Sequence, residues 1–150
     1  MLCLTHLLSG LLVGKLIGGS MLLVAAGAVV VDIDHLYNFV KKGIIYSPKK
    51  LWTTMFSPHD PHGTNRTMAH SLLGWAIATI ALLTISRQYG AMLSIGYLSH
   101  LIIDVFDSDD LHLFFPLKGS VKGPVVYNSA SEYFLNIVLA AALVMSFYLI

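Results

Sequence analysis

The stretch that decides the fold is residues 2–35, LCLTHLLSGLLVGKLIGGSMLLVAAGAVVVDIDH, an apolar run that ends in a cluster of acidic and histidine side chains. It is longer than the ~20 residues that one helix needs to cross a bilayer. At its centre, Gly18-Gly19-Ser20 combines a helix breaker with a good N-cap residue. The pattern predicts two short helices folded into a hairpin that turns near residue 19. His6 and Asp32 are equally far from that turn, so we expect them to face each other.

The composition indicates an integral membrane protein. Of 150 residues, 56% are hydrophobic and only 11% are charged, and the mean hydropathy is +0.74. Such a chain is too apolar for an ordinary soluble domain of this size. Further apolar stretches cover residues 70–86, 89–106 and 131–150, and the polar segments 41–69 and 107–130 are typical of loops at a membrane surface. We therefore expect one domain, residues 1–150, with an all-α fold: a membrane helical bundle of about five helices, made of two hairpins and a C-terminal helix.

Charge and cysteine content narrow the function classes. The net charge of +1 has no strong sign, which makes nucleic acid an unfavoured partner. A single cysteine, Cys3, excludes an internal disulfide and a cysteine-rich zinc module, so histidines and carboxylates remain as metal ligands. Lys15 lies inside the first apolar stretch, and no small-residue cleavage site follows it, which fits a signal peptide poorly.

The second pair of apolar stretches predicts another hairpin, with its turn at residues 87–90. His70 would then lie at the same depth as His100 and Asp104, at the open end of the hairpin. Because the polar segment 41–69 joins the open ends of both hairpins, all these groups should gather on one side of the bundle. Burying them there costs several kcal/mol each unless they are paired or bind a metal.

Local spacing supports metal binding. His100 and Asp104 are four residues apart and share a helix face, and His35 lies three residues after Asp32. Imidazole and carboxylate ligands suit zinc first, with manganese or iron as alternatives. The groups outnumber the ligands of one tetrahedral ion, which leaves one to three divalent ions, or one ion with a second layer of partners. The alternative for any single histidine is a packing or hydrogen-bonding role between helices. The predicted metal ligands are His6, Asp32, His35, His70, His100 and Asp104.

Two further residues are candidates for a catalytic role. Asp34 lies beside the ligands and could accept a proton, but it could equally cap the helix or hold His35 in place. Arg66 precedes His70 by four residues and could hold an anionic oxygen such as a phosphate; the alternative is an ordinary membrane-interface arginine.

Other polar groups favour structural explanations. The loop histidines and aspartate of residues 59–62 are typical of a solvated loop, and Asp107 and His112 follow a helix end, where charged residues usually face solvent. Glu132 opens the last helix, where the helix dipole favours an acid.

The order of these motifs resembles the YdjM family of inner-membrane proteins, which are thought to be metal-dependent hydrolases. The resemblance covers nearly the whole chain and rests on Thr5-His6, Asp32-Ile33-Asp34-His35, Arg66-Thr67-Met68-Ala69-His70-Ser71, His100-Leu101-Ile102-Ile103-Asp104 and Leu113-Phe114-Phe115-Pro116. It implies a remote similarity to zinc-dependent phospholipase C and P1 nuclease, whose helical sites hold zinc through His and Asp. It also implies the same metal ligands, with Asp34 beside them.

The chain departs from that family pattern in three places. Asn65 stands where a histidine is common, Ala69 stands where a threonine is common, and the acidic residues 107–110 are less usual. None of these removes a proposed ligand, but the first two weaken any role for that strip in positioning a substrate.

These features lead to one main hypothesis and two alternatives. A metal-activated water would cleave a phosphoester of a membrane lipid or lipid-linked phosphate, Asp34 or Asp104 would accept the proton, and Arg66 would hold the phosphate. The alternatives are a small ion or proton transporter and a non-catalytic adaptor whose metal only joins the helices. The oligomeric state is left open.

The distribution of basic residues predicts the orientation. The positive-inside rule places the site at the cytoplasmic face of a multi-pass inner-membrane protein, because most basic residues lie at the open ends of the hairpins.

Overall fold

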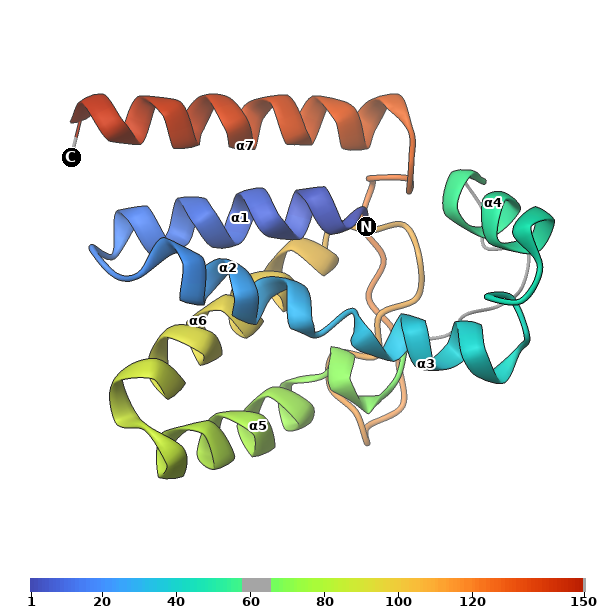
Figure 1. The fold of residues 1–150 in the computed structure, drawn as a ribbon, viewed down its shortest axis with the longest axis horizontal. Helices are drawn as coiled ribbons and strands as arrows, with labels where there is room; N and C mark the ends of the chain where they lie inside the picture. The colour runs from blue at the N-terminus through green and yellow to red at the C-terminus, as the bar shows by residue number, and fades with distance from the viewer. Residues whose placement is uncertain (58–65, 150) are drawn as a thin grey trace.

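The computed structural model describes residues 1–57 and 66–149, and this part of the chain is helical apart from loops and two isolated β-bridges (Figure 1). The elements in chain order are α1 (Cys3–Leu16), α2 (Met21–Val30), α3 (Ile33–Lys41), α4 (Pro48–Phe56), the 3₁₀ turn η1 (Met68–His70), α5 (Leu72–Ile85), α6 (Arg87–Asp104) and α7 (Ala130–Leu149). The expectation of an all-α fold is confirmed. The solvated loop predicted for residues 59–62 lies outside the described residues.

The first hairpin forms as predicted, from α1 and α2. Gly18 has a φ of +64°, a left-handed conformation that favours glycine, and the Ser20 hydroxyl caps α2 by accepting from the Leu23 amide. The two helices also approach closely through small residues. A Cβ at Gly10 would lie 2.7 Å from the Cα of Ala25. Glycine is therefore required both at the turn and at this helix contact.

The second hairpin, α5 and α6, turns earlier than predicted. Only Ser86 separates the two helices, and its hydroxyl accepts from the Tyr89 amide as the N-cap of α6. The expected turn at residues 87–90 is wrong, because those residues already form the first turn of α6. Serine is a favourable N-cap residue, so α6 begins directly after Ser86.

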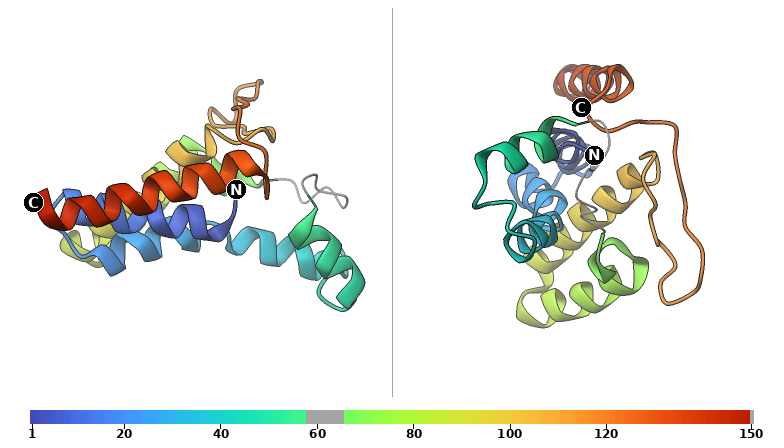
Figure 2. Two further views of the ribbon diagram at one scale, coloured as in Figure 1. Left: turned by 90° about the horizontal axis from the view of Figure 1, so that it is seen from above. Right: turned by 90° about the vertical axis from the view of Figure 1, so that its right-hand side faces the viewer.

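The two hairpins join through α2 and α6. A Cβ at Gly27 would overlap the carbonyl oxygen of Leu93, and one at Gly96 would overlap the carbonyl oxygen of Val24. These backbones are therefore nearly in contact. Figure 2 shows α7 lying on the far side of α1 from α6, so that α1 and α2 occupy the middle of the molecule.

The segment 41–69 is not wholly a loop, as the sequence had suggested. It contains α4, which begins with Pro48 at a first-turn position that tolerates proline, after Ser47 accepts from the Lys50 amide. A further helix, α3, follows α2 after a break at Val31 and Asp32. The expected number of about five helices was therefore too low.

The start of α1 is attached to α7 by Glu132, whose side chain is fully buried. Its Oε1 accepts from the Leu2 amide at 2.5 Å and from the Thr5 hydroxyl at 3.0 Å, and its Oε2 accepts from the Asn128 amide at 2.7 Å. The structural role that the sequence favoured for Glu132 is confirmed. Its hydrogen bonds to the start of α1 explain the buried carboxylate better than the dipole of α7 does.

Two helices within the described residues are long and apolar enough to cross a membrane. They are Met21–Lys41, which joins α2 and α3 and has 21 residues, and α7, which has 20. The apolar helices α1 and α5 are shorter, at 14 residues each. A helical architecture is thus established, while a multi-pass membrane bundle remains a prediction.

Candidate metal centre

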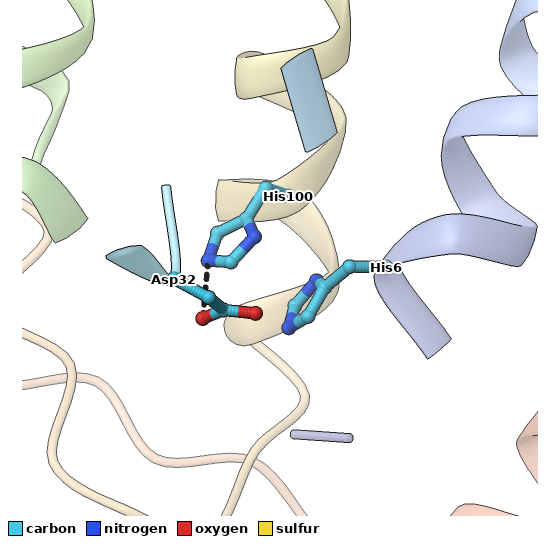
Figure 3. Close-up of side chains that lie close together, drawn as sticks. All are labelled: His6, Asp32 and His100. Atoms are coloured by element: carbon cyan, nitrogen blue, oxygen red, sulfur yellow. Dashed lines mark ion pairs between the residues drawn. The ribbon is translucent and has the colours of Figure 1, made fainter. Parts of the chain in front are cut away.

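The predicted ligands meet at one end of the bundle, where α1 begins, α2 ends and α6 ends. Figure 3 shows His6 from α1 and His100 from α6 facing Asp32, which lies just beyond α2. His6 and His100 are fully buried, and His70 is 2% exposed. Charged or hydrogen-bonding groups at such depth need partners, because water cannot reach them.

Two carboxylates face the same histidines. Asp32 Oδ1 lies 3.6, 3.7 and 3.8 Å from the Nε2 atoms of His35, His70 and His100, respectively. Asp104 Oδ2 lies 3.7 Å from His70 Nε2 and 3.5 Å from His100 Nε2. These separations exceed hydrogen-bond lengths. Two ligand atoms on a tetrahedral zinc ion with bonds of ~2.0–2.1 Å are about 3.3–3.4 Å apart. The carboxylate-to-imidazole distances of 3.5 to 3.8 Å are slightly longer than this spacing.

His6 reaches the second oxygen of Asp104. Its Nε2 lies 3.5 Å from Asp104 Oδ1, and its ring stacks on that of His100 with centroids 3.8 Å apart. Among the described residues, neither ring nitrogen of His6 nor Nε2 of His100 has a hydrogen-bond partner. Such unsatisfied buried nitrogens call for an explanation, and a bound cation supplies one.

The outer nitrogens of two histidines are held in place. His100 Nδ1 lies 2.7 Å from the carbonyl oxygen of Ala28, and His70 Nδ1 lies 3.0 Å from Asp34 Oδ2. A hydrogen on Nδ1 of His100 would be donated to the Ala28 carbonyl oxygen, which leaves the lone pair of its Nε2 directed at the two carboxylates. Metal-binding histidines are commonly fixed in this way.

Asp34 contributes to this arrangement from outside the centre. Its Oδ2 accepts from the Thr67 amide at 3.2 Å and from the Thr67 hydroxyl at 2.7 Å, besides lying next to His70. Burial lowers the pKa of His70, but the nearby carboxylates of Asp32, Asp34 and Asp104 outweigh this and raise that pKa to about 9. A cation bound at Nε2 would have to displace the proton that His70 otherwise holds there.

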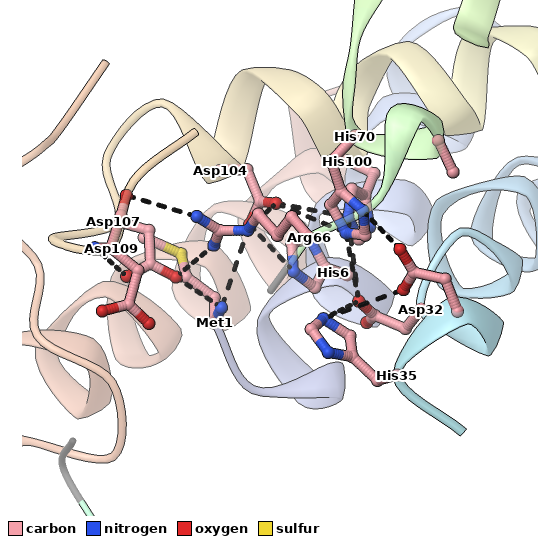
Figure 4. A network of polar contacts seen from close by, with 12 residues as sticks. Met1, His6, Asp32, His35, Arg66, His70, His100, Asp104, Asp107 and Asp109 are labelled. Carbon is pink, nitrogen blue, oxygen red and sulfur yellow. Dashed lines mark hydrogen bonds and ion pairs between the residues drawn. The ribbon is translucent and has the colours of Figure 1, made fainter. Parts of the chain in front are cut away.

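Arg66 lies between Asp104 and Asp107, on the side of the centre away from Asp32 (Figure 4). Its Nε lies 3.2 Å from Asp104 Oδ2, its Nη2 donates to Asp107 Oδ2 at 2.7 Å, and its Nη1 donates to the carbonyl oxygen of Asp109 at 3.3 Å. Burial lowers the pKa of Arg66, but the Asp104 and Asp107 carboxylates outweigh this and hold that pKa above its ordinary value. The guanidinium is therefore a permanent charge beside Asp104.

Asp107 was wrongly expected to face solvent. It is fully buried and also lies 2.6 Å from the Met1 amino group, through its Oδ2 atom. The spacing of three residues from Asp104 was the available signal, since it places both carboxylates on the same side of the helix end. His112, by contrast, is exposed, and its Nδ1 lies 3.0 Å from the carbonyl oxygen of Gly119, as expected of a residue outside the centre.

A family model described as "YdjM inner membrane protein" matches residues 1–150, the full length of the chain. The chain belongs to the YdjM family. The resemblance inferred from the motifs is thus confirmed. No curated protein sequence and no solved structure gives a significant match. The YdjM family description names a membrane location and no reaction.

In this YdjM family member, the six predicted ligands form three overlapping groups of possible metal ligands. Within each group the ligand atoms lie within 4.8 Å of one another: His6, Asp32 and His100; Asp32, His35 and His70; His70, His100 and Asp104. The hairpin argument therefore placed these residues together correctly. Whether they bind a metal remains a prediction, as do the catalytic roles of Asp34, Asp104 and Arg66.

Proposed function

We propose that this chain is a membrane-embedded, metal-dependent hydrolase that cleaves a phosphoester of a lipid or lipid-linked substrate. The observation that carries the proposal is the set of four donor atoms from Asp32, His70, His100 and Asp104, in which each carboxylate oxygen lies 3.5 to 3.8 Å from both Nε2 atoms. Two carboxylates and two neutral imidazoles match the ligand types that zinc prefers, and manganese or iron would also accept them.

The remaining ligands support more than one ion. Asp104 Oδ1 lies near His6, and Asp104 Oδ2 lies near His70 and His100. Its two oxygens could therefore contribute to two different ions. His35 lies on the more open side, near Asp32 Oδ1, and its side chain is 32% exposed. Enzymes that act on phosphoesters often use a pair of ions about 3.5–4 Å apart. One to three ions are compatible with the donor set.

A divalent ion in this centre would supply a water of lowered pKa and polarise a phosphoryl oxygen. The residues of the chain would position and neutralise the reacting groups. Asp104 or Asp34 would accept the proton; the contacts of Asp34 with His70 and Thr67 suit orientation of His70 better. Arg66 carries a buried positive charge that could pair with a phosphate oxygen, after exchanging its contact with Asp107.

The membrane location supports a lipid-linked substrate. Besides the candidate span α7 and the family, apolar side chains are exposed along much of α7 and α5, as the lipid-facing surface of a membrane protein would be. Basic residues at the metal-centre end outnumber those at the hairpin turns, Lys15 and Arg87, which favours a cytoplasmic site in a multi-pass protein. The basic residues at the centre end are Lys41, Lys42, Lys49, Lys50, Arg66, Lys118 and Lys122.

One observation favours a second candidate, a centre in which metal only joins the helices. His6, His70, His100 and Asp104 are almost fully buried, and Arg66 covers Asp104. A structural metal site is closed in this way, whereas a catalytic one keeps a position open for water. A transporter is less well supported, because the candidate groups gather at one end of the bundle.

The test measures metal content, turnover and flux in the same preparations. The full chain is purified without added metal, its ions are counted by elemental analysis, and hydrolysis is followed on a chromogenic phosphodiester and on phospholipid vesicles. His100→Gln should lose bound metal and activity. His112→Gln is the matched control, because His112 is exposed and its ring contacts only a loop carbonyl.

Three outcomes would contradict the hydrolase. Bound metal without turnover, with loss of helical structure on chelation, would indicate the structural centre. Metal-dependent ion flux across liposomes without hydrolysis would indicate the transporter. Equal metal content in wild type and His100→Gln would show that the centre does not bind the metal at all.

A further inference from the structure

The helices α3 and α4 and the residues between them, residues 33–56, expose a surface that faces away from the metal centre. We call this segment the basic arm. On α3, apolar side chains recur at the spacing of one helix face: Ile33, Leu36, Tyr37 and Val40 are 45 to 61% exposed. Only the opposite face of α3 turns toward the centre, through Asp34 and His35. The apolar face therefore has no cover within the described chain.

The second helix of the arm continues this apolar surface. Trp52, Met55 and Phe56 share one face of α4 and are 66, 46 and 51% exposed, and the rings of Trp52 and Phe56 lie 4.3 Å apart. Tyr46, between the helices, is 78% exposed. Trp and Tyr are the residues that concentrate at the boundary between water and lipid, because their rings are apolar and their N–H or O–H groups are not.

The arm is also strongly basic. Lys41, Lys42, Lys49 and Lys50 are exposed, and the only acidic residue of the arm, Asp34, contacts His70 and Thr67 instead. Across residues 1–57 and 66–149, no carboxylate lies within ion-pair distance of Lys41, Lys49 or Lys50. A positive surface with apolar and aromatic side chains beside it is complementary to an anionic lipid surface.

Hydrogen bonds fix the arm at the level where α7 begins. The Tyr127 hydroxyl donates to the carbonyl oxygen of Met55 at 2.8 Å, and the Asn128 amide side chain donates to that of Phe56 at 3.0 Å. α7 is one of the two candidate membrane spans, and it starts two residues later. If α7 crosses the bilayer, α4 lies at the membrane surface. Figure 2 shows α3 and α4 projecting beyond the other helices at this end.

We propose that the basic arm lies in the membrane interface and binds anionic phospholipid headgroups. The exposed apolar side chains enter the boundary region of the bilayer, and the lysines contact the phosphates. A second copy of the chain is a poorer occupant, because pairing two such arms would bring their lysines together. Since α3 also carries Asp34 and His35, the contact would hold the metal centre close to lipid phosphates. The proposal rests on the membrane location in the proposed function and not on hydrolysis.

The experiment uses Trp52 as the reporter in the full chain, reconstituted in phosphatidylcholine vesicles that contain phosphatidylglycerol. The Trp52 signal is the difference between wild type and Trp52→Phe, because the chain contains one other tryptophan, Trp75. Bromine placed on either lipid quenches the tryptophans that it contacts. We expect blue-shifted Trp52 emission, with stronger quenching by brominated phosphatidylglycerol than by brominated phosphatidylcholine at equal mole fraction.

The selectivity should depend on the lysines of the arm. In Lys41→Gln/Lys49→Gln/Lys50→Gln the preference for the anionic lipid should be lost, while Trp52 remains blue-shifted because the apolar face is intact. The matched control, Lys118→Gln/Lys122→Gln, removes two lysines from another loop and should keep the preference. Metal content should be the same in all these variants.

Three results would overturn the proposal. Trp52 emission typical of water, with no quenching by either lipid, would place the arm outside the bilayer. An unchanged lipid preference in the triple lysine variant would exclude headgroup binding by these lysines. Shielding of Trp52 from both lipids, together with a dimer detected by cross-linking, would show that a second copy covers the arm. Since metal content is measured separately, none of these results would be confused with a failure of the metal centre.

Discussion

The imidazole rings of His6 and His100 stack with an interplanar angle of 18°, although they come from α1 and α6. Two imidazolium ions in this arrangement would repel each other strongly, because both rings are buried away from water. The stacking therefore disfavours two simultaneous positive charges, and an imidazole nitrogen that carries no proton can bind a metal. The stacking thus links the helix packing to the proposed chemistry.

Asp34 provides a first prediction, because its contacts are those of a residue that orients His70. Asp34→Asn should weaken metal binding by about 10- to 100-fold, the usual loss when a partner of a metal-binding histidine is removed. Metal titration of the purified chain measures this, with Asp110→Asn as a control at an exposed aspartate that pairs with Lys122. Unchanged metal affinity with lost hydrolysis would instead make Asp34 the proton acceptor.

Arg66 provides a second prediction. Arg66→Gln removes one of the two cations that pair with the buried carboxylates of Asp104 and Asp107, the other being the Met1 amino group. Loss of one partner from a buried ion pair costs about 3–5 kcal/mol. Thermal unfolding followed by circular dichroism should show a large fall in Tm. Adding Asp107→Asn to Arg66→Gln should recover part of the loss. An Arg66→Gln variant as stable as wild type would contradict this account of the network.

The contact between α2 and α6 provides a third prediction. Gly96→Ala should destabilise the fold by about 1–3 kcal/mol or more, because its methyl group would overlap the carbonyl oxygen of Val24 and force the helices apart. The same displacement should weaken metal binding, since α6 carries His100. Thr84→Ala, at an exposed position of α5, is the control. Unchanged Tm in Gly96→Ala would show that the helices are less closely packed than the structure indicates.

Metal removal provides a fourth prediction. A ligand that binds only the folded state at 100 times its Kd adds about 2.7 kcal/mol of stability, so a chelator should lower the Tm and added zinc should restore it. The shift should be absent in His100→Gln and present in His112→Gln. A chelator effect of equal size in both variants would place the responsible metal elsewhere.

Much of the candidate site could be predicted from the sequence, because hairpins relate positions in a simple way. Once Gly18–Ser20 forms a turn, His6 and Asp32 must lie at similar depth, and this holds whatever surrounds them. His100 and Asp104 share a helix face through local geometry alone. The prediction for the second hairpin remained useful although its turn was misplaced. A shift of the turn by a few residues leaves His70 at the same end of the helix pair.

The tertiary structure alone decided the partners of individual side chains. Burial of Asp107 depends on Arg66, which arrives from another segment, and the contact of Asp34 with His70 depends on how α3 meets η1. The position of α4 depends on the attachment of Met55 and Phe56 to the segment that precedes α7. The sequence by itself determined the helices, their hairpins and the gathering of ligands, because these follow from local turns and periodicity. Only the folded chain determined which charges pair, because ion pairs and hydrogen bonds form between segments that no local pattern relates.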